Sequence, residues 1–134
     1  VSMSFSALVV VGDRKRSVGI GFGKAREVPS AVSKAVKEAK KQMVKIPIKG
    51  DTIPHIALGR FKAASVFLKP ASPGTGIKAG ASARAVLESV GIKNILTKCY
   101  GKRNPLNVAK ATLVGLRALR TKKEIEELRG VKIE

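Results

Sequence analysis

The chain has 134 residues, of which 27 are lysine or arginine and 9 are aspartate or glutamate, so its formal net charge is +18. A surplus of this size destabilises a folded protein by self-repulsion, and we therefore expect a polyanion as its usual partner, with nucleic acid favoured over an anionic membrane or an acidic protein. Apolar residues make up 44% of the chain, which argues against disorder. The single cysteine excludes an internal disulfide framework and a cysteine-rich zinc site. No apolar run reaches the roughly 20 residues of a membrane span.

The first elements predict a β-hairpin. Residues 4–11 form a β-branched run of strand length, and residues 17–22 alternate between apolar residues on one face and serine or glycine on the other. The turn between the two strands carries three consecutive cations, which are Arg14, Lys15 and Arg16. The serine and glycine face is flat, so it would accept either a tightly packed helix or an RNA backbone.

A helix is predicted over residues 29–44, with Pro29 in its first turn. Its apolar stripe is expected at Val32, Val36, Ala39 and Met43. Another face carries Lys34, Lys37 and Lys41. Because Glu38 is the one acid among these lysines, we favour a ridge that faces phosphate over an ordinary solvated face.

A break in the pattern near Gly50 predicts two domains, residues 1–50 and 51–134, and both are basic. The second is expected to begin with strands over 52–58 and 64–69, joined by a basic connection.

A glycine-rich loop follows these strands, and we predict that it holds phosphate. Its backbone is freed for left-handed turns by Gly74, Gly76 and Gly80. A helix is expected from Ser82 to Gly91, which is a good C′ residue. Lys78 and Arg84 flank the helix start, where unpaired N–H groups and the helix dipole favour an anion.

The remaining elements are a strand over residues 94–100 and two helices. Asn104 is the expected N-cap of the first helix and Pro105 its first residue. Its apolar stripe is expected at Leu106, Ala109, Leu113 and Leu116. A capping box at residues 121–124 predicts a short final helix.

Residues with catalytic potential are sparse. His55, the one histidine, has no nucleophile beside it, and no pair of acids has a spacing that suggests metal binding or acid–base chemistry. The glycine-rich loop lacks the order of a nucleotide-triphosphate loop, and the glycines over 19–23 lack the spacing of a dinucleotide site. We therefore expect no enzyme, no cofactor and no metal site, although the loop leaves a small-molecule phosphotransferase as an alternative.

The few aromatic residues bear on how RNA would be recognised. Phe5, Phe22 and Phe67 fall in strand patterns, and we expect them in the core. This favours recognition of folded RNA by its shape over stacking of unpaired bases on aromatic rings.

Six motifs, in this order, resemble the bacterial-type family of small-subunit ribosomal protein five. They are Phe5–Asp13 (FSALVVVGD), Gly21–Pro29 (GFGKAREVP), Thr52–His55 (TIPH), Lys69–Ile77 (KPASPGTGI), Arg84–Glu88 (RAVLE) and Asn104–Asn107 (NPLN). The resemblance covers nearly the whole chain but not the N-terminal segment of the family, in which a Lys-Gly-Gly-Arg loop precedes the first strand, so inferences made through that loop do not transfer. The family also tends to have two glycines where this chain has Gly80 and Ala81, and a left-handed Ala81 would cost about 1 kcal/mol.

The resemblance implies an α+β fold with two domains. The first would be double-stranded-RNA-binding-like, and the second would be of the ribosomal protein S5 domain 2-like type, with β-β-α-β-α order and a left-handed crossover. It also implies a structural role in the small ribosomal subunit, with contacts to its RNA and to small-subunit proteins four and eight, and an influence on subunit assembly and translational accuracy. The ribosome would be cytoplasmic or organellar, and a free-standing double-stranded-RNA-binding protein is the alternative.

The expected site residues combine the cation clusters with positions that match the family. For rRNA binding they are Arg14, Lys15, Arg16, Lys24, Arg26, Lys34, Lys37, Lys41, His55, Lys69, Lys78, Lys102 and Arg103. Gly76 and Arg84 fall where the family meets protein four.

Overall fold

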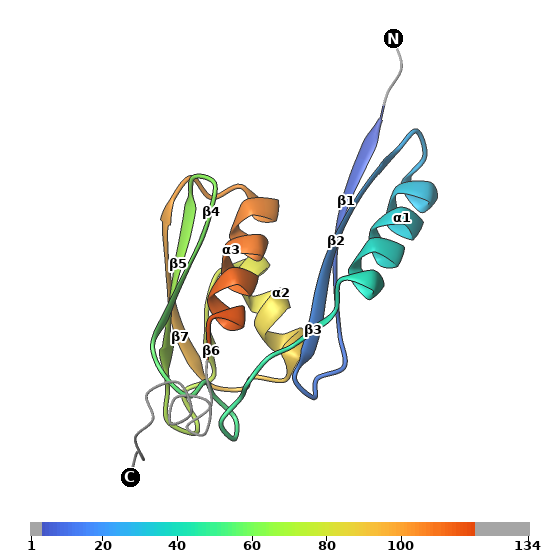
Figure 1. Ribbon diagram of the computed structural model, residues 1–134. Helices are drawn as coiled ribbons and strands as arrows, with labels where there is room; N and C mark the ends of the chain where they lie inside the picture. Colours follow the sequence, from blue (N-terminus) through green and yellow to red (C-terminus); the bar gives the residue numbers. More distant parts are fainter. Residues whose placement is uncertain (1–3, 120–134) are drawn as a thin grey trace, which may run out of the picture.

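The computed structural model describes residues 4–119, and within them it has a mixed α+β fold with two sheets and three helices. Figure 1 shows the two sheets on opposite sides of the molecule, with helices α2 (Ala81–Val90) and α3 (Pro105–Arg117) between them and helix α1 (Val28–Lys41) on the outer side of the first sheet. No helix in this part of the chain is long and apolar enough to cross a membrane.

The first sheet is an antiparallel hairpin with a short third strand. Its strands are β1 (Phe5–Gly12), β2 (Ser17–Ala25) and β3 (Val44–Lys45), in the order β1-β2-β3. Helix α1 (Val28–Lys41) covers one face. The predicted hairpin is confirmed, whereas β3 was not anticipated because two residues carry no periodicity.

The glycines of β2 face α1. A Cβ atom built on Gly21 would lie 1.8 Å from the Ala35 carbonyl oxygen, and Gly19 and Gly23 meet the helix backbone in the same way. The flat face is therefore covered by a tightly packed helix, and RNA does not lie on it.

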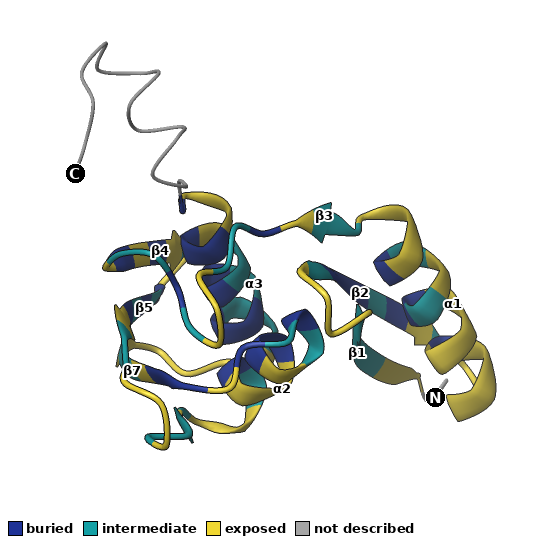
Figure 2. Ribbon diagram, turned by 90° about the horizontal axis from the view of Figure 1, so that it is seen from below, coloured by how far each residue is buried: buried dark blue, intermediate teal, exposed yellow. Residues whose placement is uncertain are grey.

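The predicted apolar stripe of α1 was correct at Ala39 and wrong at Val32. The helix buries Ala31, Ala35 and Ala39, whereas Val32 is 40% exposed. A sheet surface made of glycine lets the helix backbone approach so closely that only alanine fits between them, and the valines are turned aside. Figure 2 shows exposed residues along the outer side of α1.

The second sheet has four strands in the order β4-β5-β7-β6. They are β4 (Ala57–Phe61), β5 (Ala64–Pro70), β6 (Ile77–Lys78) and β7 (Ile95–Gly101). Neighbours are antiparallel except β6 and β7, which are parallel. Helices α2 (Ala81–Val90) and α3 (Pro105–Arg117) lie on one face of this sheet (Figure 1).

The first strand of the second half begins later in the chain than the predicted strand over 52–58. Strand β4 begins at Ala57 and runs to Phe61 through residues that we expected to form the connection. Gly59 lies directly under α3, since a Cβ atom there would be 1.9 Å from the Ala111 carbonyl oxygen. Close packing against a helix thus explains a glycine that we had placed in the connection between two strands.

The predicted helix ends of the second half are confirmed within one residue. Asn104 caps α3, and its Oδ1 atom accepts hydrogen bonds from the backbone N–H groups of Leu106 (3.1 Å) and Asn107 (3.3 Å). Gly91 ends α2 with a left-handed φ of 99°. Ala81 lies within α2 and has no positive φ, so the strain considered there does not arise. The predicted final helix at residues 121–124 lies outside the described residues.

The stripe predicted for α3 was correct in part. Ala109 and Leu116 are buried, whereas Leu106 and Leu113 are half-buried. The buried face also includes Val108, Ala111, Thr112 and Gly115.

The hairpin tip joins the two halves of the molecule. The backbone N–H groups of Arg14 and Arg16 donate to the carbonyl oxygens of Ser89 and Val90, each over 2.9 Å, and so satisfy acceptors at the end of α2. Both arginines have positive φ values, of 58° and 97°. The domain boundary near Gly50 stays a prediction, because one buried cluster contains residues from both sides of it.

Candidate nucleic-acid interface

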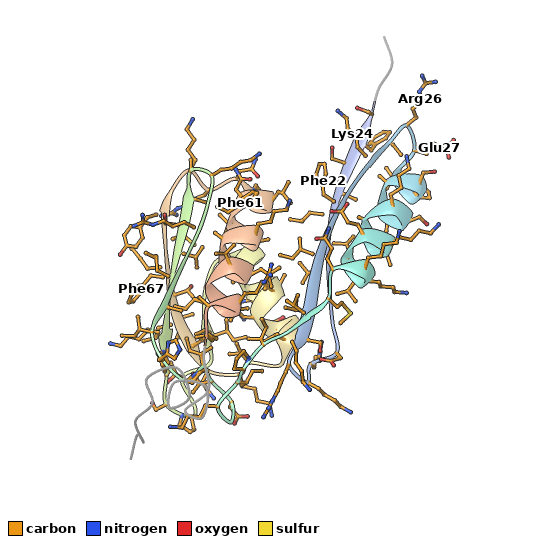
Figure 3. All side chains as sticks on the ribbon, viewed as in Figure 1. Phe22, Lys24, Arg26, Glu27, Phe61 and Phe67 are labelled. Carbon is orange, nitrogen blue, oxygen red and sulfur yellow. The ribbon has the colours of Figure 1, made fainter. Side chains whose placement is uncertain are left out.

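The predicted RNA-binding cations of the first half lie in three places on its surface. Arg14, Lys15 and Arg16 form the exposed hairpin tip. Figure 3 places Lys24 and Arg26 at the other end of β2. Since β2 has nine residues, these two groups are separated by about 25 Å. The structure therefore does not bring them together into one cluster.

The lysines of α1 form the third place. Lys34, Lys37 and Lys41 are exposed, while the opposite side of the helix is buried against glycine. The Nζ atom of Lys34 donates to the Lys24 carbonyl oxygen over 3.4 Å, which joins the ridge to the end of β2. The predicted ridge is thus present as a solvent-facing row of cations.

Asp13 organises the hairpin tip. Its Oδ1 atom accepts hydrogen bonds from the backbone N–H groups of Lys15 (2.7 Å) and Ser17 (3.0 Å). The bonds from Ser17 and Lys15 hold the pKa of the Asp13 carboxyl below its ordinary value. The one acid in this turn therefore sets the backbone conformation from which the three cations project.

We expect the stabilising effect of Asp13 to depend on pH. A lowered pKa means that the folded chain binds this proton less readily than the unfolded chain, so the effect is present above the ordinary value of 3.8 and is lost as pH falls through the folded value. Urea midpoints of the wild type and of Asp13→Asn, which keeps the Oδ1 acceptor but does not titrate, should differ by a constant amount above about pH 5 and converge or reverse in acid. A difference that stays constant down to pH 2 would contradict this role.

The glycine-rich loop is held open from beneath by Asn94. This side chain is 6% exposed, and its Oδ1 atom accepts hydrogen bonds from the backbone N–H groups of Gly74 (3.1 Å) and Gly76 (3.0 Å). Both glycines have positive φ values, of 91° and 76°, with no atom within 4 Å of a Cβ position. Sequence reasoning missed Asn94, and the available signal was an uncharged polar residue directly before the apolar residues Ile95 and Leu96.

A groove of about 580 Å³ lies at the start of α2. Its lining includes residues 80–82 and three cationic residues, which are Lys78, Lys98 and Arg103. Lys98 was missed, because its position became clear only from the register of β7. The predicted phosphate-binding region thus lies beside β7.

Arg84 does not line this groove. Its Nη2 atom donates to the Ile77 carbonyl oxygen over 2.6 Å, and its Nη1 atom lies 3.4 Å from Glu88 in an ion pair. Arg84 does lie in the first turn of α2, as predicted, but the structure does not bring it together with Lys78 in this groove. It braces the loop from the other side, where it lines a cavity with Arg14.

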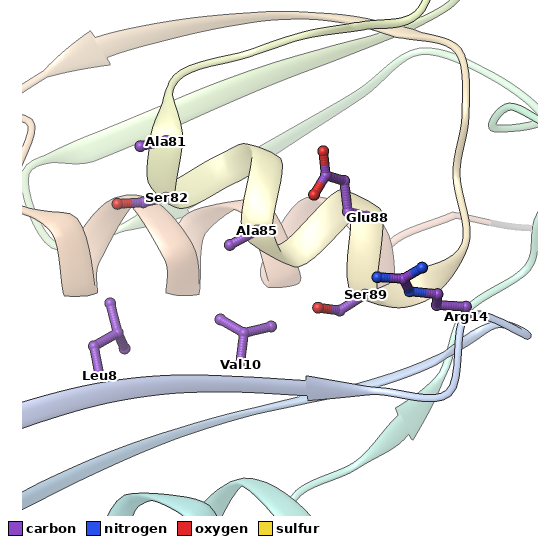
Figure 4. Close-up of a pocket in the computed structure, with 8 residues that line it drawn as sticks. All are labelled: Leu8, Val10, Arg14, Ala81, Ser82, Ala85, Glu88 and Ser89. Atoms are coloured by element: carbon purple, nitrogen blue, oxygen red, sulfur yellow. The ribbon is translucent and has the colours of Figure 1, made fainter. Parts of the chain in front are cut away.

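A separate cavity of about 420 Å³ lies between β1 and α2 (Figure 4). Leu8 and Val10 of β1 face Ala85 and its neighbours on α2, and Arg14 and Glu88 lie toward one end. The described residues include no group of three or more histidine, cysteine or acidic side chains that could hold a metal ion.

Comparison with known proteins identifies the family. Residues 2–47 match the N-terminal domain of ribosomal protein S5, and residues 59–129 match its C-terminal domain. The chain belongs to the ribosomal protein S5 family. It is 58% identical over 127 residues to "Small ribosomal subunit protein uS5" of Syntrophobacter fumaroxidans, covering 95% of this chain and 76% of that protein. It is 51% identical over 131 residues to the protein of the same name from Rubrobacter xylanophilus, covering 98% of this chain and 66% of that protein.

The remaining predicted residues of this S5-family chain are dispersed over its second half. His55 is half-buried, and its Nδ1 atom donates to the Ile56 carbonyl oxygen over 2.9 Å. Lys69 and Lys102 are exposed, and the Lys102 backbone N–H donates to the Ala63 carbonyl oxygen over 3.2 Å. The RNA-binding roles of these residues stay predictions.

Proposed function

We propose that this chain is a structural constituent of the small ribosomal subunit without enzymatic activity, and that it binds the RNA of that subunit through cations of both halves. The matched relatives are named as small-subunit ribosomal proteins. Ribonucleoprotein assembly and translation are therefore its setting, on a ribosome that we place in the cytoplasm.

The observation that carries this proposal is that the predicted cations are exposed and lack acidic partners among the described residues. The hairpin tip, the α1 ridge and the groove beside β7 present exposed lysines and arginines, and none of the predicted ones forms an ion pair with a described acid. A folded chain with charges in this state is stabilised when phosphates of a nucleic acid replace the missing counterions.

We propose a division of labour between the halves, with the boundary near Gly50. The first would act as a double-stranded-RNA-binding-like unit, in which the α1 ridge and the hairpin tip follow the RNA backbone rather than read base edges. The second would also contact proteins of the subunit, with small-subunit proteins four and eight as its partners. Gly76, whose Cβ position is open, and Arg84, which braces the loop, would lie at the contact with protein four and so influence translational accuracy.

The proposal is tested by the salt dependence of binding to an RNA fragment from the small subunit. The logarithm of affinity should fall with the logarithm of salt concentration, with a slope of roughly −0.9 for each duplex phosphate contacted. A triple variant with Lys34→Gln, Lys37→Gln and Lys41→Gln should make the slope shallower by about 2 to 3.

A matched control removes three exposed lysines from outside the predicted set, by Lys45→Gln, Lys49→Gln and Lys93→Gln. Its slope should stay close to that of the wild type. Equal losses in both triple variants would show a diffuse effect of net charge, and an affinity that is insensitive to salt would refute the proposal. Cosedimentation with small subunits from cell extracts should distinguish a ribosomal protein from a free-standing duplex-RNA binder.

A further inference from the structure

The second sheet has an uncovered face on the side away from α2 and α3. Strand alternation directs large apolar side chains to this face, and Leu58, Leu96 and Tyr100 are 43%, 38% and 56% exposed. Phe67 is half-buried there, between Val66 and Leu68, which are fully buried on the other face.

Neither Phe67 nor the exposed Phe5 lies in the core, so our expectation was wrong for both. It is absent from the half-buried residues that pack against the core cluster, whereas Phe61 is among them. Figure 3 shows Phe67 on the side of the sheet away from the helices. The sequence analysis favoured shape recognition over base stacking because it placed the strand aromatics in the core, and this reason does not hold for Phe67.

Cations alternate with these apolar side chains across the strands. The register places Phe67 between Leu58 and Lys98, and Leu96 between Lys69 and Lys78. A third row consists of Arg60, Ser65 and Tyr100. Strands β4 to β7 carry no acidic residue, so each row combines positive charge with apolar surface.

The two rings are close enough to act together. Tyr100 lies opposite Ser65, two residues from Phe67 on the same face, so the two aromatic residues are diagonal neighbours at about 7–8 Å. At this separation, two bases of an extended strand can each stack on a ring while the intervening phosphate remains near Lys98.

We infer that this face binds an unpaired segment of RNA, with bases stacked on Phe67 and Tyr100 and with Arg60, Lys69, Lys78 and Lys98 along the backbone. The inference rests on the proposed RNA-binding function and adds a single-stranded ligand to it. Stacking is tolerant of sequence, because every base has a flat face, and cations supply the affinity for phosphate. A duplex would leave the rings without partners, and an apolar protein surface would bury several cations unpaired.

The test uses the full chain and a fluorescein-labelled, mixed-sequence RNA of ten nucleotides that does not pair with itself. Phe67→Leu and Tyr100→Leu should each weaken its binding roughly 5- to 100-fold. Binding of a blunt RNA duplex should change less than twofold, because these rings would not contact it. Phe5→Leu is the matched control: Phe5 is also an exposed aromatic residue of a strand, 38% exposed, but it lies on the other sheet and should leave both affinities unchanged.

Tyr100 also provides a direct readout that requires no substitution. It is the one tyrosine of a chain without tryptophan, so its fluorescence should be quenched on binding the unpaired RNA and not on binding the duplex. Unchanged single-strand affinity in both leucine variants, with wild-type circular dichroism, would overturn the inference and assign this face to a protein partner. Weak salt dependence with every RNA would instead count against the proposed function itself.

Discussion

Gly21→Val is expected to destabilise the first half of the chain by about 3 kcal/mol or more. A Cβ atom at this position would lie 1.8 Å from the Ala35 carbonyl oxygen and 2.6 Å from the Ala39 backbone nitrogen. Because both atoms belong to the backbone of α1, no change of rotamer relieves the overlap, and the helix must move away from β2. The urea midpoint followed by circular dichroism should fall, and amide hydrogen exchange should accelerate in β1, β2 and α1.

Gly80→Ser is the matched control for this variant. Gly80 has a φ of −72° and no atom within 4 Å of its Cβ position, and it is the N-cap of α2, where serine is favoured. Its stability should change by less than about 0.5 kcal/mol. If Gly21→Val unfolded at the wild-type urea concentration, α1 would not be packed on β2 in solution.

Local signals in the sequence were sufficient for several elements. The β-branched run of β1 and the cationic turn after it predicted the hairpin, and Asn104 with Pro105 marked the start of α3. These features act within a few residues of their own position, by capping groups or restricting the backbone, so no knowledge of the packing partner was needed.

Features that depend on the surface against which an element packs could not be predicted from the local sequence. Periodicity alone preferred Val32 and Val36 for the buried side of α1, but the glycine surface of β2 selects alanine. In β4, Gly59 looked like a turn residue because nothing local reveals that α3 lies above it. The sheet-forming role of β6 likewise depends on β7, which comes later in the chain.

The same distinction between local sequence and tertiary packing applies to the candidate nucleic-acid interface. Residue type identified the cations, but the fold decides which of them share a surface. Lys98 joins Lys78 and Arg103 only through the register of β7, whereas Arg84 is drawn away by the Ile77 carbonyl oxygen and Glu88. Net charge therefore predicts the class of partner, and tertiary structure decides where that partner is bound.

Asn94→Leu should destabilise the second half by about 2–4 kcal/mol and collapse the glycine-rich loop. The side chain is buried, and leucine of similar size would leave the N–H groups of Gly74 and Gly76 without their acceptor. Asn94→Asp is the matched control, because it keeps an acceptor oxygen at the same place and should retain most of the stability.

Amide exchange at both glycines should accelerate at least tenfold in the leucine variant relative to the aspartate variant, because each tenfold change corresponds to about 1.4 kcal/mol of lost protection. Equal exchange in the two variants would mean that the positive φ values of the glycines, and not Asn94, hold the loop open. Since Lys78 and the start of α2 follow directly after this loop, its collapse should also reduce incorporation into small subunits even though every cation remains in the chain.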